Sequence, residues 1–590
     1  MKKRLLMTTM CFIPTGIGKL AVQLKQKRKI LFMVVLLSCR SFAQEKKEAI
    51  PQRDVALPSQ EAVQEKTETP LPKIDLPEFV ITGQEQISAP TVKKESFDEE
   101  KIYSPEKPVA GSRKLFIGSE FEPKQSKSFV PQPQPLNGKV FAGIGFYTTP
   151  VLDGWFGQHD QMNSYMLNGY YQQSNGYVPN GDWWKGGFGT QGKYVMPDSS
   201  TFLPYMQISG TMQYDRDAYK AFASPSPNRL RDLSYFHTSL GLGSRYALPY
   251  RSLNGFDYTG VVGFSRYSAK DSIISAERDF FLSGTASTQF GEFVLRGQMD
   301  YRITSYDVAA PPPLSYQTGQ WFVLRLDGRT MLLSNLQVNF SLRQYLYRGA
   351  VGAAAGRLFP QVDVQYFLLE GISAFVQFSP AVQRNTLAGT VQKNKYITFS
   401  SPMAHTDIPV EIATGMEAKL AERWTAAGKF RYRLMNNYQT FLDSNDAKLW
   451  EVLYLSGVRS TVFDVSIAYR SDDRTTIKAY LKTMREEQKD SSHSMPYVPA
   501  LSFGTVAYHA FEMGLNVEVT AEYIGSRYTN FASTHKNAAY VYTGIKVDML
   551  LFDRIRAYGE LGNALSQKYY LWNGYQERTL YLMLGASYSW

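Results

Sequence analysis

The sequence predicts an all-β fold, a transmembrane antiparallel β-barrel of about 22 strands (roughly 16 to 22), preceded by a disordered Pro-rich segment. The 39 Tyr, 35 Phe and 44 Gly among 590 residues favour strands over helices. The mean hydropathy of -0.29 argues against a bundle of membrane-spanning helices. Alternation of apolar and polar residues then continues through residues 137–590 without a domain break, as one large barrel requires.

Residues 1–43 have the pattern of a secretory signal peptide. A basic stretch precedes the short apolar run 30–37, and Ser41-Phe42-Ala43 is a small-x-small cleavage site. The apolar run is too short to span a bilayer as a helix. We expect cleavage after Ala43. The alternative hypothesis is lipoprotein processing at Cys39.

The net charge of +11 is mostly a property of this leader. Nine of the 64 Lys and Arg lie in residues 1–43, which contain no Asp or Glu, so the rest of the chain is almost neutral. No basic stripe or zinc-finger spacing indicates nucleic-acid binding. Both cysteines, Cys11 and Cys39, also lie in the leader, so the mature chain would have neither disulfides nor thiolate sites.

Residues 44–136 are expected to form a disordered periplasmic linker. They hold 12 of the 29 prolines and too few apolar residues to compensate the entropy of ordering. One apolar island, residues 76–83, interrupts the linker. Its pattern fits either a chance short strand or a docking strand that adds to the sheet of a periplasmic partner. The island consists of Leu76, Pro77, Glu78, Phe79, Val80, Ile81, Thr82 and Gly83.

Residues 137–590 alternate with the period of two that places apolar and polar side chains on opposite faces of a strand. In one stretch Leu336, Val338, Phe340 and Leu342 alternate with Asn335, Gln337, Asn339, Ser341 and Arg343. A soluble sandwich or propeller could also produce this alternation. The tight turns at 333–335, 369–371 and 552–554 are expected on the periplasmic side of a barrel.

The last residues strengthen the barrel prediction. One face holds Leu580, Leu582, Leu584, Ala586, Tyr588 and Trp590, and the other holds Thr579, Ser587 and Ser589. The sequence therefore stops on an aromatic residue within an apolar strand face, as expected for the interfacial girdle of a membrane barrel. We expect Tyr588 and Trp590 to be read as a signal by the outer-membrane insertion machinery.

The sequence offers no catalytic, cofactor-binding or metal-binding site, and we expect a protein that is not an enzyme. The six histidines lack metal-ligand spacing, a Gly-x-Ser-x-Gly elbow is absent, and His493 lies among serines by chance. We expect the histidines on the surface or in the lumen. Polar-face charges should line the lumen: Arg296, Arg302, Arg343, Lys478, Lys482, Glu518 and Glu522. Interfacial anchoring is preferred over solute binding for Trp155, Trp183, Trp184 and Trp572.

The last 80 or so residues resemble the C-terminal end of TonB-dependent outer-membrane receptors. The matching stretches are Tyr523–Tyr528, Arg556–Leu565, Lys568–Tyr570, Asn573–Tyr575 and Tyr588-Ser589-Trp590. In that family a short box near the N-terminus contacts TonB, and residues 79–83 look like such a box. The resemblance implies a bacterial outer-membrane barrel, with the N-terminal segment in the periplasm and a TonB-like energy-transducing protein as a partner.

One departure from that family concerns the plug domain that fills its barrels. Residues 84–136 are too few for the plug and lack its motifs, so inward loops, the linker or another protein must block the lumen. Three functions follow as hypotheses. The first is an outer-membrane transport barrel that imports a nutrient or other solute. The second is a non-transporting assembly or anchoring component that holds a plug, periplasmic or surface protein. The third is a passive porin.

Overall fold

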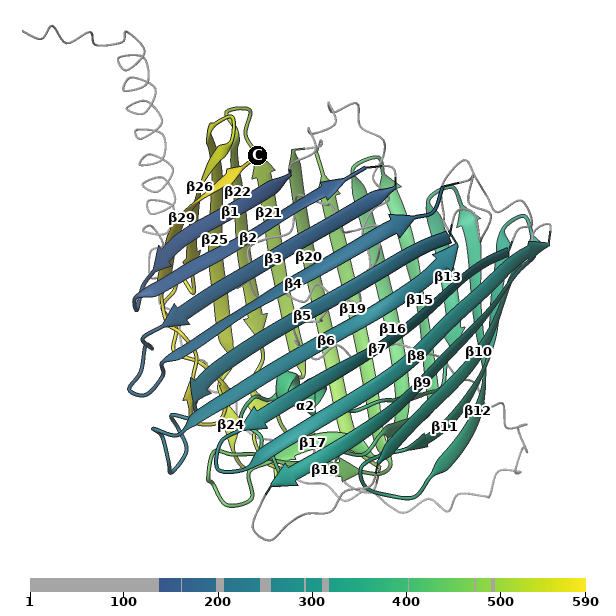
Figure 1. Cartoon of the computed structure of the whole chain (residues 1–590), viewed down its shortest axis with the longest axis horizontal. Helices are drawn as coiled ribbons and strands as arrows, with labels where there is room; N and C mark the ends of the chain where they lie inside the picture. The colour runs from purple at the N-terminus through teal and green to yellow at the C-terminus, as the bar shows by residue number, and fades with distance from the viewer. Residues whose placement is uncertain are drawn as a thin grey trace, which may run out of the picture. The chain divides into compact units, whose positions relative to one another are not determined.

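The computed structural model describes residues 137–590, except 161, 198–205, 245–255, 291–292, 310–317, 402, 472–473 and 490–493. The predicted signal peptide, the linker and the island at 76–83 lie outside the described residues. Figure 1 shows that the described residues form a barrel of long tilted strands.

The barrel is one antiparallel sheet in which each strand pairs with the next, and β29 pairs back onto β1. Its strands are β1 (Gly138–Gly145), β2 (Thr149–His159), β3 (Asn163–Ser174), β4 (Trp183–Val195), β5 (Met206–Lys220), β6 (Leu230–Ser244), β7 (Phe256–Lys270), β8 (Ile274–Phe290), β9 (Phe293–Ala309), β10 (Gly319–Leu333), β11 (Leu336–Arg348), β12 (Ala355–Leu369), β13 (Ile372–Phe378), β14 (Ala381–Gln383), β15 (Thr406–Ala421), β16 (Trp424–Asn436), β19 (Val458–Arg470), β20 (Thr475–Gln488), β21 (Leu501–Ala510), β22 (Leu515–Ile524), β25 (Tyr540–Phe552), β26 (Ile555–Gly562) and β29 (Tyr581–Ser589).

The strand number confirms the prediction of about 22. β13 and β14 pair with successive parts of β15, so they are two pieces of one strand. The 23 segments of the sheet therefore make 22 barrel strands. Pairing of Lys139 with Ser589 closes the barrel, which leaves no free sheet edge.

The predicted division into two faces is also confirmed. On β11, Phe340 and Leu342 are exposed, whereas Gln337 and Arg343 point to the interior and are buried. On β29, Leu584 and Tyr588 are exposed and Ser587 is buried. The outside of the barrel thus carries an apolar band, the surface that a transmembrane barrel presents to lipid. The fold is that of a bacterial outer-membrane β-barrel, and a soluble sandwich or propeller is excluded.

Trp590 takes part in closing the barrel. Its carbonyl oxygen accepts a hydrogen bond from the Asn137 amide at 2.6 Å, and its own amide donates to the Gly138 carbonyl at 3.1 Å. A Cβ at Gly138 would lie 2.3 Å from the indole ring, so this position needs glycine. The Tyr588 and Trp590 rings stack with centroids 5.8 Å apart. The terminal aromatic face predicted from the sequence is therefore part of the seam between the first and last strands.

The two ends of the barrel differ. We call the end where β1 begins and β29 finishes the terminal end, and the opposite one the loop end. The predicted tight turns at 333–335, 369–371 and 552–554 all lie at the terminal end, where Gly371 has a φ of 81° that suits a short hairpin turn. None of the helices among the described residues is long and apolar enough to cross a membrane.

Long loops gather at the loop end, at the bottom of Figure 1. We call them together the cap. The cap comprises residues 384–405 with the short helix α2 (Leu387–Lys393), the hairpin of β17 (Tyr438–Leu442) and β18 (Glu451–Leu455), the pair β23 (Arg527–Tyr528) and β24 (Lys536–Asn537), and the hairpin of β27 (Tyr570–Trp572) and β28 (Tyr575–Gln576).

Candidate functional site

The centre of the cap is a cluster of aromatic side chains from three separate loops. The rings of Tyr396 and Tyr575 stack with centroids 3.4 Å apart, and Trp450 is fully buried beside them. The Thr398 amide donates to the Trp450 carbonyl at 2.8 Å, and the Trp450 amide donates to the Tyr396 carbonyl at 3.0 Å. Burial of these large rings stabilises the cap as one packed layer.

Residues 384–405 cross the opening of the barrel. They leave the wall between β14 and β15, yet they contact β6, which is distant in the strand order. The Arg231 guanidinium on β6 donates to the carbonyls of Lys395 at 3.0 Å and Ile397 at 2.5 Å, and it lies 3.8 Å from the Phe399 ring centroid. Charge-assisted hydrogen bonds of this kind are about twice as strong as neutral ones, so Arg231 fixes the crossing segment.

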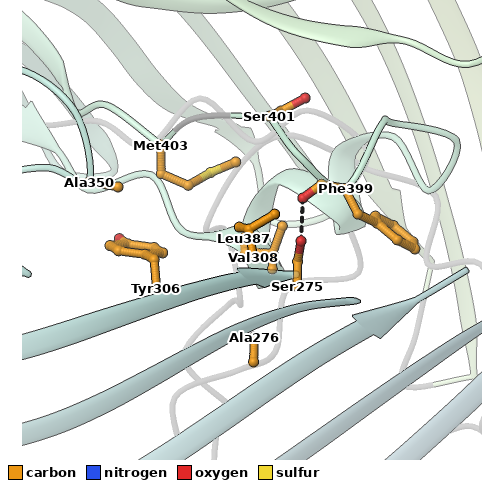
Figure 2. Close-up of a pocket in the computed structure, with 9 residues that line it drawn as sticks. All are labelled: Ser275, Ala276, Tyr306, Val308, Ala350, Leu387, Phe399, Ser401 and Met403. Carbon is orange, nitrogen blue, oxygen red and sulfur yellow. Dashed lines mark hydrogen bonds between the residues drawn. The ribbon is translucent and has the colours of Figure 1, made fainter. Parts of the chain in front are cut away.

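Three side chains of β8 hold the same segment. The Glu277 carboxylate accepts from the Leu387 amide at 2.6 Å, and Asp279 pairs with Arg384 at 2.6 Å. Figure 2 shows the pocket at this junction, where the Ser275 hydroxyl donates to the Phe399 carbonyl at 2.5 Å. Its walls are mostly apolar and closely spaced. The pocket is therefore part of the seam between cap and wall.

His405 lies buried at the end of the crossing segment, whereas the histidines were expected on the surface or in the lumen. Its ring packs against Trp321 and Tyr347, with centroids 5.2 and 5.8 Å away, and its Nδ1 accepts from the Asn385 amide at 3.3 Å. Burial, and then the nearby Arg384 charge, lower the pKa of His405 to about 3. The neutral imidazole is thus part of the packed cap.

Acidification should therefore destabilise the protein through His405. Its pKa in the fold is below its ordinary value of 6.5, so the unfolded chain binds the proton first as the pH falls. The stabilising contribution is complete above pH 6.5 and decreases toward pH 3, by roughly 1.4 kcal/mol per pH unit. Urea unfolding in detergent at pH 6.5 and pH 5 should show this loss in the wild type and a smaller one in His405→Gln. Equal losses in the two proteins would refute the assignment.

The predicted lumen charges do face the interior. Arg302 pairs with Asp279 at 3.2 Å, Glu518 accepts from Lys546 at 3.1 Å, and Glu522 accepts from the Tyr480 hydroxyl at 2.5 Å. They are distributed around the wall and do not converge on one site. Within the described residues, no group of three or more His, Cys, Asp or Glu could hold a metal ion.

The tryptophan prediction is wrong for two of its four residues. Trp183 and Trp572 pack against the buried core of the cap and do not anchor the barrel in the membrane interface. The Trp572 and Tyr497 rings are tilted relative to each other, with centroids 4.4 Å apart. Loop aromatics lack the period of a strand, so composition alone could not separate a girdle residue from a cap residue. Trp450 could not be predicted for the same reason, and Arg231 on β6 could not be told apart from other arginines that face the lumen.

The closed barrel places the protein in the class of outer-membrane β-barrels, and the comparison with solved structures agrees with this class. No protein-family model and no curated protein matches the chain. Among solved structures, it resembles the FrpB iron transporter from Neisseria meningitidis (TM-score 0.61, 10% identity, 77% of this chain and 81% of that chain). It also resembles the ferric-catecholate import receptor Fiu from E. coli (0.58, 10%, 77% and 82%) and the siderophore receptor PirA from Pseudomonas aeruginosa (0.56, 10%, 77% and 80%). The chain therefore has the barrel fold of TonB-dependent receptors, as its last residues suggested. The described residues comprise a barrel with its loops, without a plug among them.

Proposed function

We propose that this protein is an outer-membrane transport barrel that imports a nutrient or another solute and has no plug domain of its own. The observation that supports this most is the cap, because a 22-strand lumen needs a closure and residues 384–405 cross it. The structural neighbours are iron and siderophore transporters, which supports transport as the general activity.

The proposal includes an energy source. Residues 76–83 would lie in the periplasm and add a strand to a TonB-like protein, as the resemblance of residues 79–83 to a TonB box implies. The terminal end of the barrel would then face the periplasm and the cap would face outward. Pulling on the linker would open the cap, since the described residues include no plug that could be pulled.

Deletion of residues 76–83 is expected to abolish uptake while the barrel still assembles. The deletion removes only the docking strand, so outer-membrane abundance should be unchanged. The assay compares growth of the native host on limiting nutrients for the wild type, the deletion and a scrambled 76–83 variant of equal composition. Uptake that survives the deletion would contradict energised transport.

The packed cap also leaves a second candidate, a non-transporting anchor. Buried side chains such as Trp450 make the cap rigid, and a sealed barrel could hold a plug, periplasmic or surface protein in the membrane. Stoichiometric co-purification of such a protein, with no uptake phenotype in a deletion strain, would favour the anchor. The same packing argues against the passive porin.

We also propose Tyr588 and Trp590 as the insertion signal. Both lie on the outer face of the closing strand, where assembly machinery could read them before the seam forms. Truncation after Ser587 should reduce the heat-modifiable barrel in outer membranes at least about fivefold, because the seam with β1 loses its last pairs. Trp590→Phe should assemble normally. Normal assembly of the truncated chain would exclude this role.

A further inference from the structure

Three cationic side chains gather where β4 and β5 meet the cap. Trp183 on β4 lies opposite Tyr219 on β5, and the three cationic groups lie near these two aromatic rings. Lys185 Nζ lies 5.9 Å from the Trp183 ring centroid, and Arg578 Cζ lies 5.0 Å from the same centroid. Lys395 Nζ lies 4.9 Å from the Tyr219 centroid. The aromatic faces partly stabilise the three charges and fix their positions.

The charges of these three cations are only partly compensated, because one carboxylate, Asp217, lies near them. Asp217, the cross-strand neighbour of Lys185, attracts both Lys185 and Lys395, whereas Arg578 and Lys395 repel Lys185. Within the described part of the chain, none of the three cations forms an ion pair with a carboxylate. Like charges that lie close together repel one another, and an anion between them would remove this cost.

Arg578 gives the second, independent observation. Its Nη2 atom is buried and has no hydrogen-bond partner among the described residues. Burial also lowers the pKa of this guanidinium, and the nearby Glu577 carboxylate offsets only part of the effect. Buried donors in native proteins are nearly always paired, so an unpaired guanidinium nitrogen beside two ammonium groups indicates a missing acceptor. Guanidinium and ammonium groups together suit carboxylate or phosphate oxygens.

We infer that Lys185, Lys395 and Arg578 form a binding site for a carboxylate- or phosphate-bearing solute at the junction of cap and wall. The site joins the barrel wall (Lys185) to the crossing segment of the cap (Lys395) and to the segment between β28 and β29 (Arg578). An anion bound there contacts both fixed and movable parts of the closure. This inference rests on the proposed transport function, because it names the charge of the imported solute.

Calorimetry on the mature full-length chain in a non-ionic detergent tests the site. Citrate and inorganic phosphate are titrated separately at low ionic strength into the wild type, Lys185→Gln, Lys395→Gln and Arg578→Gln. Lys220→Gln is the matched control, because it removes a nearby charge that already pairs with Asp182. The wild type should bind at least one anion with a Kd below about 1 mM. Each variant of the site should weaken binding at least about tenfold, and the control should change it less than twofold.

The outcomes separate the possibilities. Binding of citrate alone identifies a carboxylate ligand, binding of phosphate alone identifies a phosphate ligand, and binding of both identifies a general oxyanion site. If neither citrate nor phosphate binds, the inference is overturned. It is also overturned if the three site variants bind as tightly as the wild type, or if Lys220→Gln weakens binding as much as they do. Lys395 is exposed, so its variant should fold even if the others do not. Binding is measured without transport, so a failure here is distinguishable from a failure of the uptake assay.

Discussion

Replacing residues 386–404 by a four-residue Gly-Ser linker is expected to convert the barrel into an open pore. These residues cross the lumen, and their removal takes away the partners of Trp450 and Tyr575 as well as the segment that Arg231 holds. In planar lipid bilayers the variant should conduct ions at least about tenfold better than the wild type, since an unblocked lumen of this strand number is wide.

The control for this experiment alters the barrel without touching the cap. Replacement of Glu422 and Arg423, the turn between β15 and β16 at the terminal end, by Asn-Gly should leave conductance unchanged. Equal conductance of the wild type and the cap variant would mean that the crossing segment does not close the lumen. The proposed gating role of the cap would then fail, whereas the barrel itself would be unaffected.

Glu411→Ala is expected to destabilise the barrel by about 3–5 kcal/mol. Glu411 on β15 and Arg433 on β16 form an ion pair at 2.9 Å, and both side chains are only 1% exposed. Removing the carboxylate leaves a buried guanidinium charge without its counterion. Unfolding by urea in lipid vesicles, followed by tryptophan fluorescence, measures the loss.

Two further variants show whether burial is the cause. Glu411→Leu with Arg433→Met removes both charges and should lose far less stability than the single change, because no unpaired charge remains. Glu512→Ala breaks the exposed pair with Arg474, at 2.7 Å, and should cost much less stability than Glu411→Ala, because solvent screens the exposed charges. If the double variant is as unstable as Glu411→Ala, the buried charge of Arg433 is not the reason for the loss of stability.

Local pattern determined most of the barrel. Leu336 to Arg343 and Leu580 to Trp590 alternate with period two, and both stretches place their apolar side chains outward as expected. This works because each strand of a barrel has one lipid face and one lumen face along its whole length. The strand number was less certain, since it depends on which segments pair, and a break such as that between β13 and β14 is not visible in the alternation.

The way the lumen is closed could not be chosen from the sequence. Inward loops, the linker and another protein were equally consistent with residues 84–136 being too short for a plug. The structure shows inward loops at the loop end, through contacts such as that of Arg231 with Ile397, which are 166 positions apart. Such contacts have no local signature, because an arginine that faces the lumen and one that fixes a loop occupy the same strand positions.

The amino-acid sequence by itself determined a lipid-facing barrel that ends in an aromatic strand, because alternation along a strand is a property of near neighbours. Only the tertiary structure decided that Trp450, Tyr396 and Tyr575 form a cap, and that Lys185, Lys395 and Arg578 meet beside it. These groups come from segments far apart in the chain, and only closure of the sheet brings them together.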